Sequence, residues 1–276
     1  MVERGRDQAH GLRRLFAPGR PRVIELVAGG AGVGRALVAV NLAVALAQSG
    51  RDTLLIDAFR HPEPPQALVG LGCDSDAALA AAPAAAIEID AVEGLAVWPL
   101  ELAERVSPPL PIPIPAQLPG RTRLADCVLV NNAATRPFAW TGEHEAHERL
   151  IVLSRGSASI TAAYALVKRL SAQGMQRRFQ VLVNRVASEA EARLIHRNIA
   201  SVAQGHLDVR LDLAGFIPAD AALARAAALR RSVLDLEPDA PSARAFRRLA
   251  ESLARPARGL ARAPLRAVPA QVAASL

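Results

Sequence analysis

A glycine-rich loop is the part of this sequence whose residue types best suit chemistry. It contains Gly29, Gly32 and Gly34, and it lies between the apolar run RVIELVA and the helical pattern RALVAVNLAVALAQSG. Glycines at such a turn let successive backbone N–H groups converge on a phosphate at the positive end of the helix. The same glycines also suit a plain tight turn, so the loop alone leaves both interpretations open.

The residues after the glycines lack the groups that phosphate chemistry uses most often. Arg35 and Ala36 stand where a phosphate-binding loop carries lysine and a hydroxyl. Arg35 keeps the positive charge, but its planar guanidinium is bulkier than an ammonium group. Ala36 offers no oxygen to a magnesium ion. Lys168 is the only lysine of the chain, which indicates a general bias toward arginine and weakens Arg35 as a specific replacement.

The elements that must position this loop alternate along the chain. Continuous apolar runs predict buried parallel strands at RVIELVA, DTLLIDA, GLAVWPL, DCVLVNNA, RLIVLSRG, FQVLVNRV and VRLDLAGFIP. Helical patterns lie between them, notably SITAAYALVKRLSAQG and SEAEARLIHRNIASVAQGHL, in which Leu194 and Ile195 are expected to face the core. The alternation predicts a three-layer α/β fold, with a mainly parallel sheet covered by helices on both faces.

Three segments depart from this alternation. Residues 1–20 form an arm with a short helical pattern in DQAHGLRRLF, and residues 21–254 form the main domain. Inside that domain, the prolines of residues 107–120 exclude a helix and predict an extended loop or linker. Residues 255–276 are basic and interrupted by prolines, a composition typical of a disordered tail.

Composition limits the function classes. The 276 residues, 51% of them hydrophobic, are enough for one large α/β domain. No apolar run reaches the roughly 18 residues of a membrane span, and the charged N-terminus is not a signal peptide, so we expect a cytoplasmic protein. The net charge of +7 allows contact with nucleic acid, although a solvated arginine-rich surface explains it more simply.

Cysteines and histidines show no convincing metal pattern. Cys73 and Cys127 lie in unrelated contexts, and Cys127 is expected to be a small core residue because it lies in an apolar run. His144 and His147 in GEHEAHERL have a spacing that suits two metal ligands on one helical face. An exposed acidic helix is the simpler interpretation, so no metal site is predicted there.

Taken in order and spacing, several segments resemble the MinD/ParA-type P-loop ATPases. They are GGAGVGRALVAVNLAVALAQSG, DTLLIDAFRHPEPPQALVGLG, DCVLVNNA, SASITAAYALVKRL, VLVNRVAS and LAGFIPAD. Within that family they look most like the FlhG/FleN regulators of flagellar number. DQAHGLRR in the arm is similar to the DQAxxLR helix with which FlhG proteins engage FlhF, a signal-recognition-type GTPase. The resemblance implies a MinD-like P-loop fold, and an arm that contacts an FlhF-like GTPase through Asp7, Gln8, Leu12, Arg13 and Leu15.

The resemblance also places the nucleotide loop. It implies that ATP or ADP would contact Gly29, Gly32, Gly34 and Arg35. The family's loop reads GKGGVGKT, whereas this chain has GGAGVGRA at residues 29–36. Gly30 therefore replaces the signature lysine that reaches across an ATP-bound dimer, and Ala36 replaces the hydroxyl that holds Mg²⁺.

The metal-binding strands depart from the family as well. Of the family's DAD motif, Asp57 is the sole surviving candidate for a catalytic or magnesium contact, because Phe59 replaces the second carboxylate. Asn131 stands where the Walker-B carboxylate should be. Phosphoryl transfer depends on positioning and on neutralising charge, so these replacements predict that ATP hydrolysis is absent or very slow and that Mg²⁺ is doubtful.

Asn184, Pro218 and Asp220 match positions that border adenine in relatives, so a base pocket could survive; a strand end and a turn also explain them. A flagellar transcription activator or a switch-complex protein is a further expected partner, with a polar location through the partner. The proline-containing tail argues against membrane attachment. Residues 107–120 replace a region near the relatives' dimer interface, which leaves homodimerisation open.

Three functions therefore stay open. The favoured hypothesis is a FlhG/FleN-like regulator of flagellar number or placement that binds nucleotide weakly or does not hydrolyse it. The first alternative is an active MinD-like ATPase with an atypical site. The second is a ParA-like protein that binds DNA without sequence preference, for which binding should fall steeply with salt.

Overall fold

The computed structural model describes residues 21–59, 70–72, 87–88, 92–101, 111–113, 125–132, 139–141, 146–172 and 177–254. The predicted arm, with Asp7, Gln8, Leu12, Arg13 and Leu15, lies outside these residues, as does the tail after residue 254.

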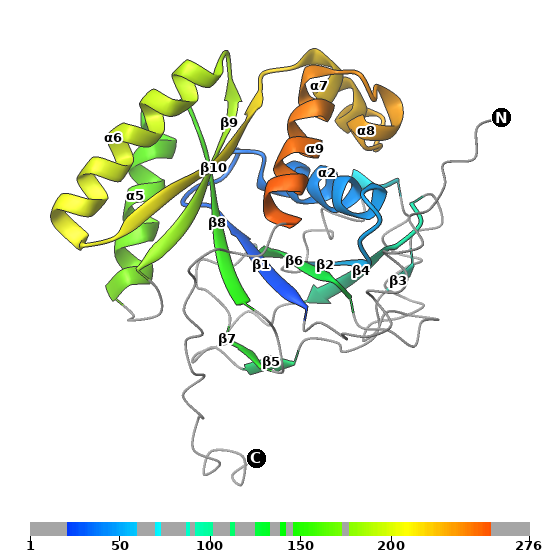
Figure 1. Ribbon diagram of the computed structural model, residues 1–276, viewed down its shortest axis with the longest axis horizontal. Coiled ribbons are helices and arrows are strands. Elements are labelled where there is room, and N and C mark those ends of the chain that lie inside the picture. Colours follow the sequence, from blue (N-terminus) through cyan, green and yellow to red (C-terminus); the bar gives the residue numbers. More distant parts are fainter. Residues whose placement is uncertain are drawn as a thin grey trace, which may run out of the picture.

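An eight-stranded sheet forms the centre of the described chain (Figure 1). Its strand order is β10-β9-β8-β1-β6-β2-β4-β3, and all neighbours pair in parallel except β3 with β4. The strands are β1 (Arg22–Val27), β2 (Thr53–Phe59), β3 (Ile87–Glu88), β4 (Leu95–Glu101), β6 (Cys127–Asn132), β8 (Ala146–Ser154), β9 (Arg178–Val186) and β10 (Arg210–Pro218). The expected mainly parallel sheet is therefore confirmed.

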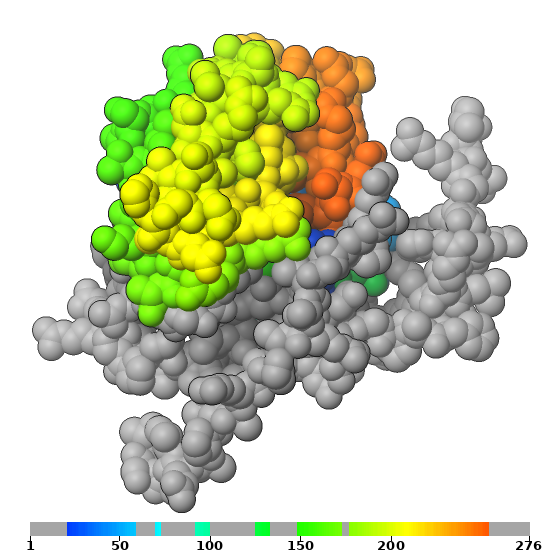
Figure 2. All heavy atoms as spheres, turned by 60° about the vertical axis from the view of Figure 1, so that its left-hand side comes forward, coloured from blue at the N-terminus to red at the C-terminus, as the bar shows by residue number. Residues whose placement is uncertain are grey.

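Helices cover both faces of this sheet. They are α2 (Arg35–Gln48), α5 (Ser157–Ala172), α6 (Glu189–Leu207), α7 (Ala221–Ala228), α8 (Val233–Leu236) and α9 (Pro241–Ala254). Alternate residues of β8 pack into two different clusters, one with α5 and α6 and the other with α2 and α9. In Figure 2 the yellow surface of α6 and β10 lies to the left, and the orange surface of α9 lies to the right of it. The three-layer α/β fold is confirmed.

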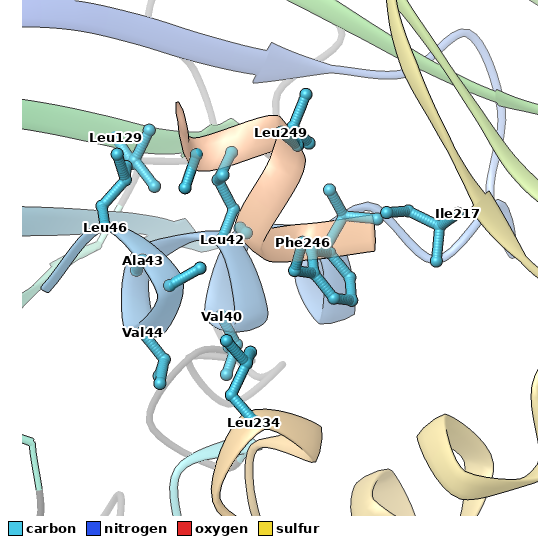
Figure 3. Packing of buried hydrophobic residues seen from close by; sticks show 14 of the residues in the cluster. Val40, Leu42, Ala43, Val44, Leu46, Leu129, Ile217, Leu234, Phe246 and Leu249 are labelled. Carbon is cyan, nitrogen blue, oxygen red and sulfur yellow. The ribbon is translucent and has the colours of Figure 1, made fainter. Parts of the chain in front are cut away.

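Helix α2 is the centre of the larger cluster. Its residues from Val38 to Ala47 are all buried, which is typical of a helix enclosed on every side. Figure 3 shows Leu42 on the side of α2 toward Leu249 and Phe246 of α9, and Leu46 beside Leu129 of β6. The buried Asn41 accepts hydrogen bonds from Ser232 Oγ (3.0 Å) and the Val233 N–H (2.9 Å), and so joins α2 to α8. This packing fixes the helix that begins at the glycine loop.

The start of β8 corrects one expectation. The acidic segment around His147 was expected to be an exposed helix, but His147 belongs to strand β8, and His144 lies outside the described residues. Glu148 is buried because its side chain points to the α9 face, where it accepts two hydrogen bonds from Arg22 at 2.7 and 2.8 Å. Arg22 also donates to the Leu253 carbonyl, so β1, β8 and α9 are joined at this end of the sheet.

Helix α6 corrects a second expectation. Ile195 is buried as expected, but Leu194 is 51% exposed. The inward face of α6 consists of Ala192, Ile195, Ile199 and Ala203. Leu194 points about 100° away from Ile195 around the helix, which places it outside the one face that α6 buries.

Two other expectations concern Cys127 and the prolines. Cys127 is buried in the core as expected, and burial raises the pKa of its thiol to about 12. The described part of the proline-rich segment, β5 (Pro111–Pro113), pairs in parallel with β7 (Ala139–Thr141). None of the described helices has the length and apolar character needed to cross a membrane.

Candidate functional site

The glycine loop joins the carboxyl end of β1 to the start of α2. Gly32 and Gly34 have φ angles of 75° and 84°, in the left-handed region that favours glycine. Gly34 is the N-cap of α2 and, being a glycine, has no side chain with which to cap the first turn. Because the first turn of a helix has backbone N–H groups without helical partners, this end of α2 suits an anion.

The loop packs tightly against its neighbours. A Cβ atom at Gly29 would lie 2.1 Å from the backbone carbonyl of Ala162 in α5, and one at Gly34 would lie 2.7 Å from Asn184 Nδ2. At Gly30 the nearest atom would be the Ala162 Cβ at 3.6 Å, an ordinary contact. Packing therefore explains Gly29 and Gly34 even without a ligand, whereas the position of Gly30 has room for a side chain.

The end of β9 binds the loop through two adjacent residues. Asn184, which is 1% exposed, donates from Nδ2 to the Val33 carbonyl over 2.8 Å. Arg185 donates from Nη1 to the Gly32 carbonyl over 3.0 Å, and its own φ is 59°. A positive φ is uncommon for a residue other than glycine, and such residues often lie at functional sites. Asn184 thus holds the loop, and its expected place beside a base stays a prediction.

Pro218 and Asp220 lie next to this strand end. Pro218 ends β10 and pairs in register with Val186 of β9. Asp220 is the N-cap of α7: one carboxylate oxygen accepts from the Ala222 N–H (2.9 Å) and the other from the N–H (2.9 Å) and Oγ (2.6 Å) of Ser242. Burial raises the pKa of Asp220, but these hydrogen bonds outweigh that effect, and the pKa falls below its usual value. Asp220 thus joins α7 to α9.

Three residues that the sequence singled out meet at the carboxyl ends of β2 and β6. Asp57 and Asn131 are direct neighbours in the parallel register of these strands, and each is 1% exposed. Asn131 donates from Nδ2 to Asp57 Oδ1 over 2.6 Å. Arg35, the first residue of α2, donates from Nε to Asn131 Oδ1 over 2.7 Å. The structure therefore joins Arg35 to Asp57 through the amide of Asn131.

Magnesium does not fit this donor set. An octahedral Mg²⁺ site is built from oxygen ligands, with one or two carboxylates. Ala36 has no side-chain oxygen, Asp57 Oδ1 accepts a hydrogen bond from Asn131, and the amide oxygen of Asn131 accepts one from Arg35. Within the ranges that the structure describes, no group of three or more His, Cys, Asp or Glu residues could hold a metal ion. Phe59 ends β2, where it provides no carboxylate.

The sequence identified most of these residues but not their contacts. It singled out Asn131 only as a lost carboxylate, and it gave Arg185 no role. Tertiary structure was needed because Asn131 lies 96 positions from Arg35 and 74 from Asp57, while Arg185 lies 153 positions from Gly32. The left-handed φ of Arg185 has no signal in the residue type.

Comparison with known proteins identifies a nucleotide-binding domain family whose model matches most of the chain. The family model of the CobQ/CobB/MinD/ParA nucleotide-binding domain matches residues 24–233. The chain belongs to this family. The expected resemblance to the FlhG/FleN regulators is also confirmed: the antiactivator FleN of Pseudomonas aeruginosa is 29% identical over 245 residues, which cover 84% of this chain and 86% of FleN.

Solved members of the MinD/ParA family share the fold. The MinD cell division protein of Aquifex aeolicus has a TM-score of 0.58 and 20% identity, covering 87% of this chain and all of that one. The septum site-determining protein MinD of Pyrococcus horikoshii, solved with Mg-ADP, has a TM-score of 0.55 and 21% identity, covering 84% of this chain and 96% of that one. The expected MinD-like P-loop fold is therefore confirmed.

Proposed function

We propose that this chain is a FleN-like regulator of flagellar number or placement that acts as a binding protein and does not hydrolyse ATP. The observation that carries the proposal is the hydrogen-bonded chain from Arg35 through Asn131 to Asp57. An ATPase of this family would need a lysine, a metal ion and carboxylates at these places. Here a neutral amide joins the remaining cation to the remaining carboxylate.

The loop itself supports weak nucleotide binding at most. Its left-handed glycines and the uncapped start of α2 suit a phosphate. Arg35 and Asp57 carry opposite charges, so together they do not add net positive charge for a triphosphate. When bound, Mg-ATP would supply a reactive phosphoryl group. Without a hydroxyl at residue 36 or a second carboxylate at residue 59, the side chains of this chain do not position a metal or an attacking water.

The partner of this regulator is an FlhF-like GTPase, which the arm engages. Leu12 and Leu15 provide apolar anchors, Arg13 provides a polar contact, and Asp7 and Gln8 begin the motif. By resemblance, the docked arm stimulates GTP hydrolysis by the partner. A flagellar transcription activator is a second partner, in keeping with the description of the Pseudomonas relative as an antiactivator.

Two measurements test the proposal. The first is phosphate release by the purified full chain with ATP and Mg²⁺, where we expect no turnover above a protein-free blank. The comparison is a variant with five family residues restored: Gly30→Lys, Arg35→Lys, Ala36→Thr, Phe59→Asp and Asn131→Asp. Magnesium-dependent turnover by the wild type that disappears in Asp57→Ala contradicts the proposal and favours the atypical ATPase.

The second measurement is retention of an FlhF-like GTPase by the full chain. We expect retention to be lost in Leu12→Asp and in a chain without residues 1–20, while Leu194→Asp, a change of equal size and charge on exposed α6, leaves it intact. Equal retention by all four proteins would refute the role of the arm. A salt series on random duplex DNA separates the ParA-like alternative, because binding to phosphates falls steeply with salt.

A further inference from the structure

We propose that Asn131 turns the metal position of this domain into a metal-free latch. The latch consists of the side chains of Arg35, Asn131 and Asp57, and it holds the start of α2 to the ends of β6 and β2 without Mg²⁺. The inference rests on the proposed function only in that both assign no hydrolysis to this site. It adds that the domain keeps one arrangement of its glycine loop whether or not Mg²⁺ is present.

The chemistry of the three side chains requires an amide at the middle position. A guanidinium can only donate hydrogen bonds, and an ionised carboxylate can only accept them. The amide of Asn131 accepts from Arg35 at 2.7 Å and donates to Asp57 at 2.6 Å. An aspartate has nearly the same shape, but at residue 131 it would place an oxygen without a proton against Asp57. Two such carboxylates need a cation or a shared proton between them.

Burial makes this difference large. Asp57 and Asn131 are each 1% exposed, and their strands place them side by side in register. A buried carboxylate is costly unless hydrogen bonds and an opposite charge compensate it. Asn131 provides the hydrogen bond and relays the attraction to Arg35. The latch therefore compensates the Asp57 charge with groups of the chain itself.

The opposite side of the loop is held in the same way. Asn184 and Arg185 donate to the carbonyls of Val33 and Gly32, at 2.8 and 3.0 Å. Gly29 packs directly on the backbone of Ala162 in α5. The loop is thus attached to β6 through Arg35 and to β9 through two carbonyls, all by internal contacts. No step of this arrangement depends on a bound metal.

The test compares melting temperatures of three full-length proteins in EDTA and in millimolar Mg²⁺. They are the wild type, Asn131→Asp, and the charge-swapped double variant Asp57→Asn with Asn131→Asp. In the double variant the carboxylate at residue 131 accepts directly from Arg35, and the amide at residue 57 donates to that carboxylate. The latch is thus restored, with the negative charge moved from β2 to β6. Asn131→Asp alone places two carboxylates together.

We expect the wild type and the charge-swapped variant to melt within about 2 °C of each other. The melting temperature of each should be the same in EDTA and in Mg²⁺. Asn131→Asp should melt roughly 6–12 °C lower in EDTA, as expected for an uncompensated buried charge in a chain of this size, and should recover part of the loss in Mg²⁺. A rise in the melting temperature of the wild type with Mg²⁺ overturns the latch, as does an Asn131→Asp protein that melts like the wild type in EDTA.

The result stays decisive if Asn131→Asp does not fold. Folding of the charge-swapped variant then supports the latch, and failure of both variants overturns it, because the swap keeps one guanidinium, one amide and one carboxylate joined by the same number of hydrogen bonds. Partner retention through residues 1–20 is measured separately. A latch that responds to Mg²⁺ with intact retention overturns this inference alone, whereas a metal-insensitive latch without retention overturns the proposed function alone.

Discussion

Arg149 of β8 donates from Nε to Oε2 of Glu25 in β1 over 3.0 Å, and both side chains are at most 2% exposed. The two residues face each other in the parallel register of their strands. The other carboxylate oxygen of Glu25 accepts from Asn132 Nδ2 of β6 over 2.6 Å. This polar cluster lies on the face of the sheet opposite to Asn131, and it joins the three strands that end beside the glycine loop.

We predict that Glu25→Gln lowers the free energy of unfolding by about 3–5 kcal/mol, because it leaves the Arg149 charge buried without its carboxylate. Urea unfolding followed by circular dichroism measures the change. The matched control is Glu189→Gln, which removes a carboxylate from an exposed pair with Arg193 on α6. The control should change stability by less than about 1 kcal/mol. If both variants lost the same free energy of unfolding, the buried pair of Glu25 and Arg149 would stabilise the protein no more than the exposed pair on α6.

The glycine loop offers a comparison between two of its glycines, Gly34 and Gly30. Gly34→Ala places a Cβ 2.7 Å from Asn184 Nδ2 on a backbone with φ of 84°, so it should destabilise the domain by roughly 1–3 kcal/mol. Gly30→Ala meets only an ordinary contact at 3.6 Å and should be neutral or stabilise by up to about 1 kcal/mol. Thermal unfolding of both variants shows whether Gly34→Ala is the less stable of the two. The reverse order would mean that the loop has a different conformation.

The cap of α7 predicts a pH dependence. The folded-state pKa of Asp220 is lowered, so the stability that its charge contributes is present above the usual value of 3.8 and is lost as pH falls through the folded-state pKa. Asp220→Ala should cost about 1–2 kcal/mol at pH 7, through lost capping. The difference from the wild type should shrink as the pH drops below about 4. A gap in unfolding free energy that is constant from pH 7 to 3 contradicts the assigned charge.

Cys127 should be unreactive in the folded protein. Burial raises the pKa of its thiol to about 12, and only the thiolate is a good nucleophile. In a Cys73→Ser variant, iodoacetamide at pH 8 should leave the native protein unlabelled and should label the urea-unfolded protein once per chain. Mass spectrometry gives the count. Fast labelling under native conditions would place the Cys127 thiol at the surface.

Local patterns predicted the elements well, since strand and helix periodicity and the turn requirements of glycine depend on neighbouring residues. The errors arose where a neighbour was distant. The segment at His147 reads as an acidic helix, yet it is a strand, because its backbone pairs in parallel with β1, a segment far away in the chain. Leu194 is exposed because α6 buries only the face that meets the sheet.

The sequence by itself determined the α/β alternation, the place of the glycine loop and the residue types at positions 35, 36, 57, 59 and 131, because these are properties of short segments. Only the tertiary structure decided that the remaining residues satisfy one another. Parallel pairing of β2 with β6 and the start of α2 beside them bring Asp57, Asn131 and Arg35 within hydrogen-bonding distance. Hydrogen bonding acts over about 3 Å, and it is the order of strands that brings such distant residues this close.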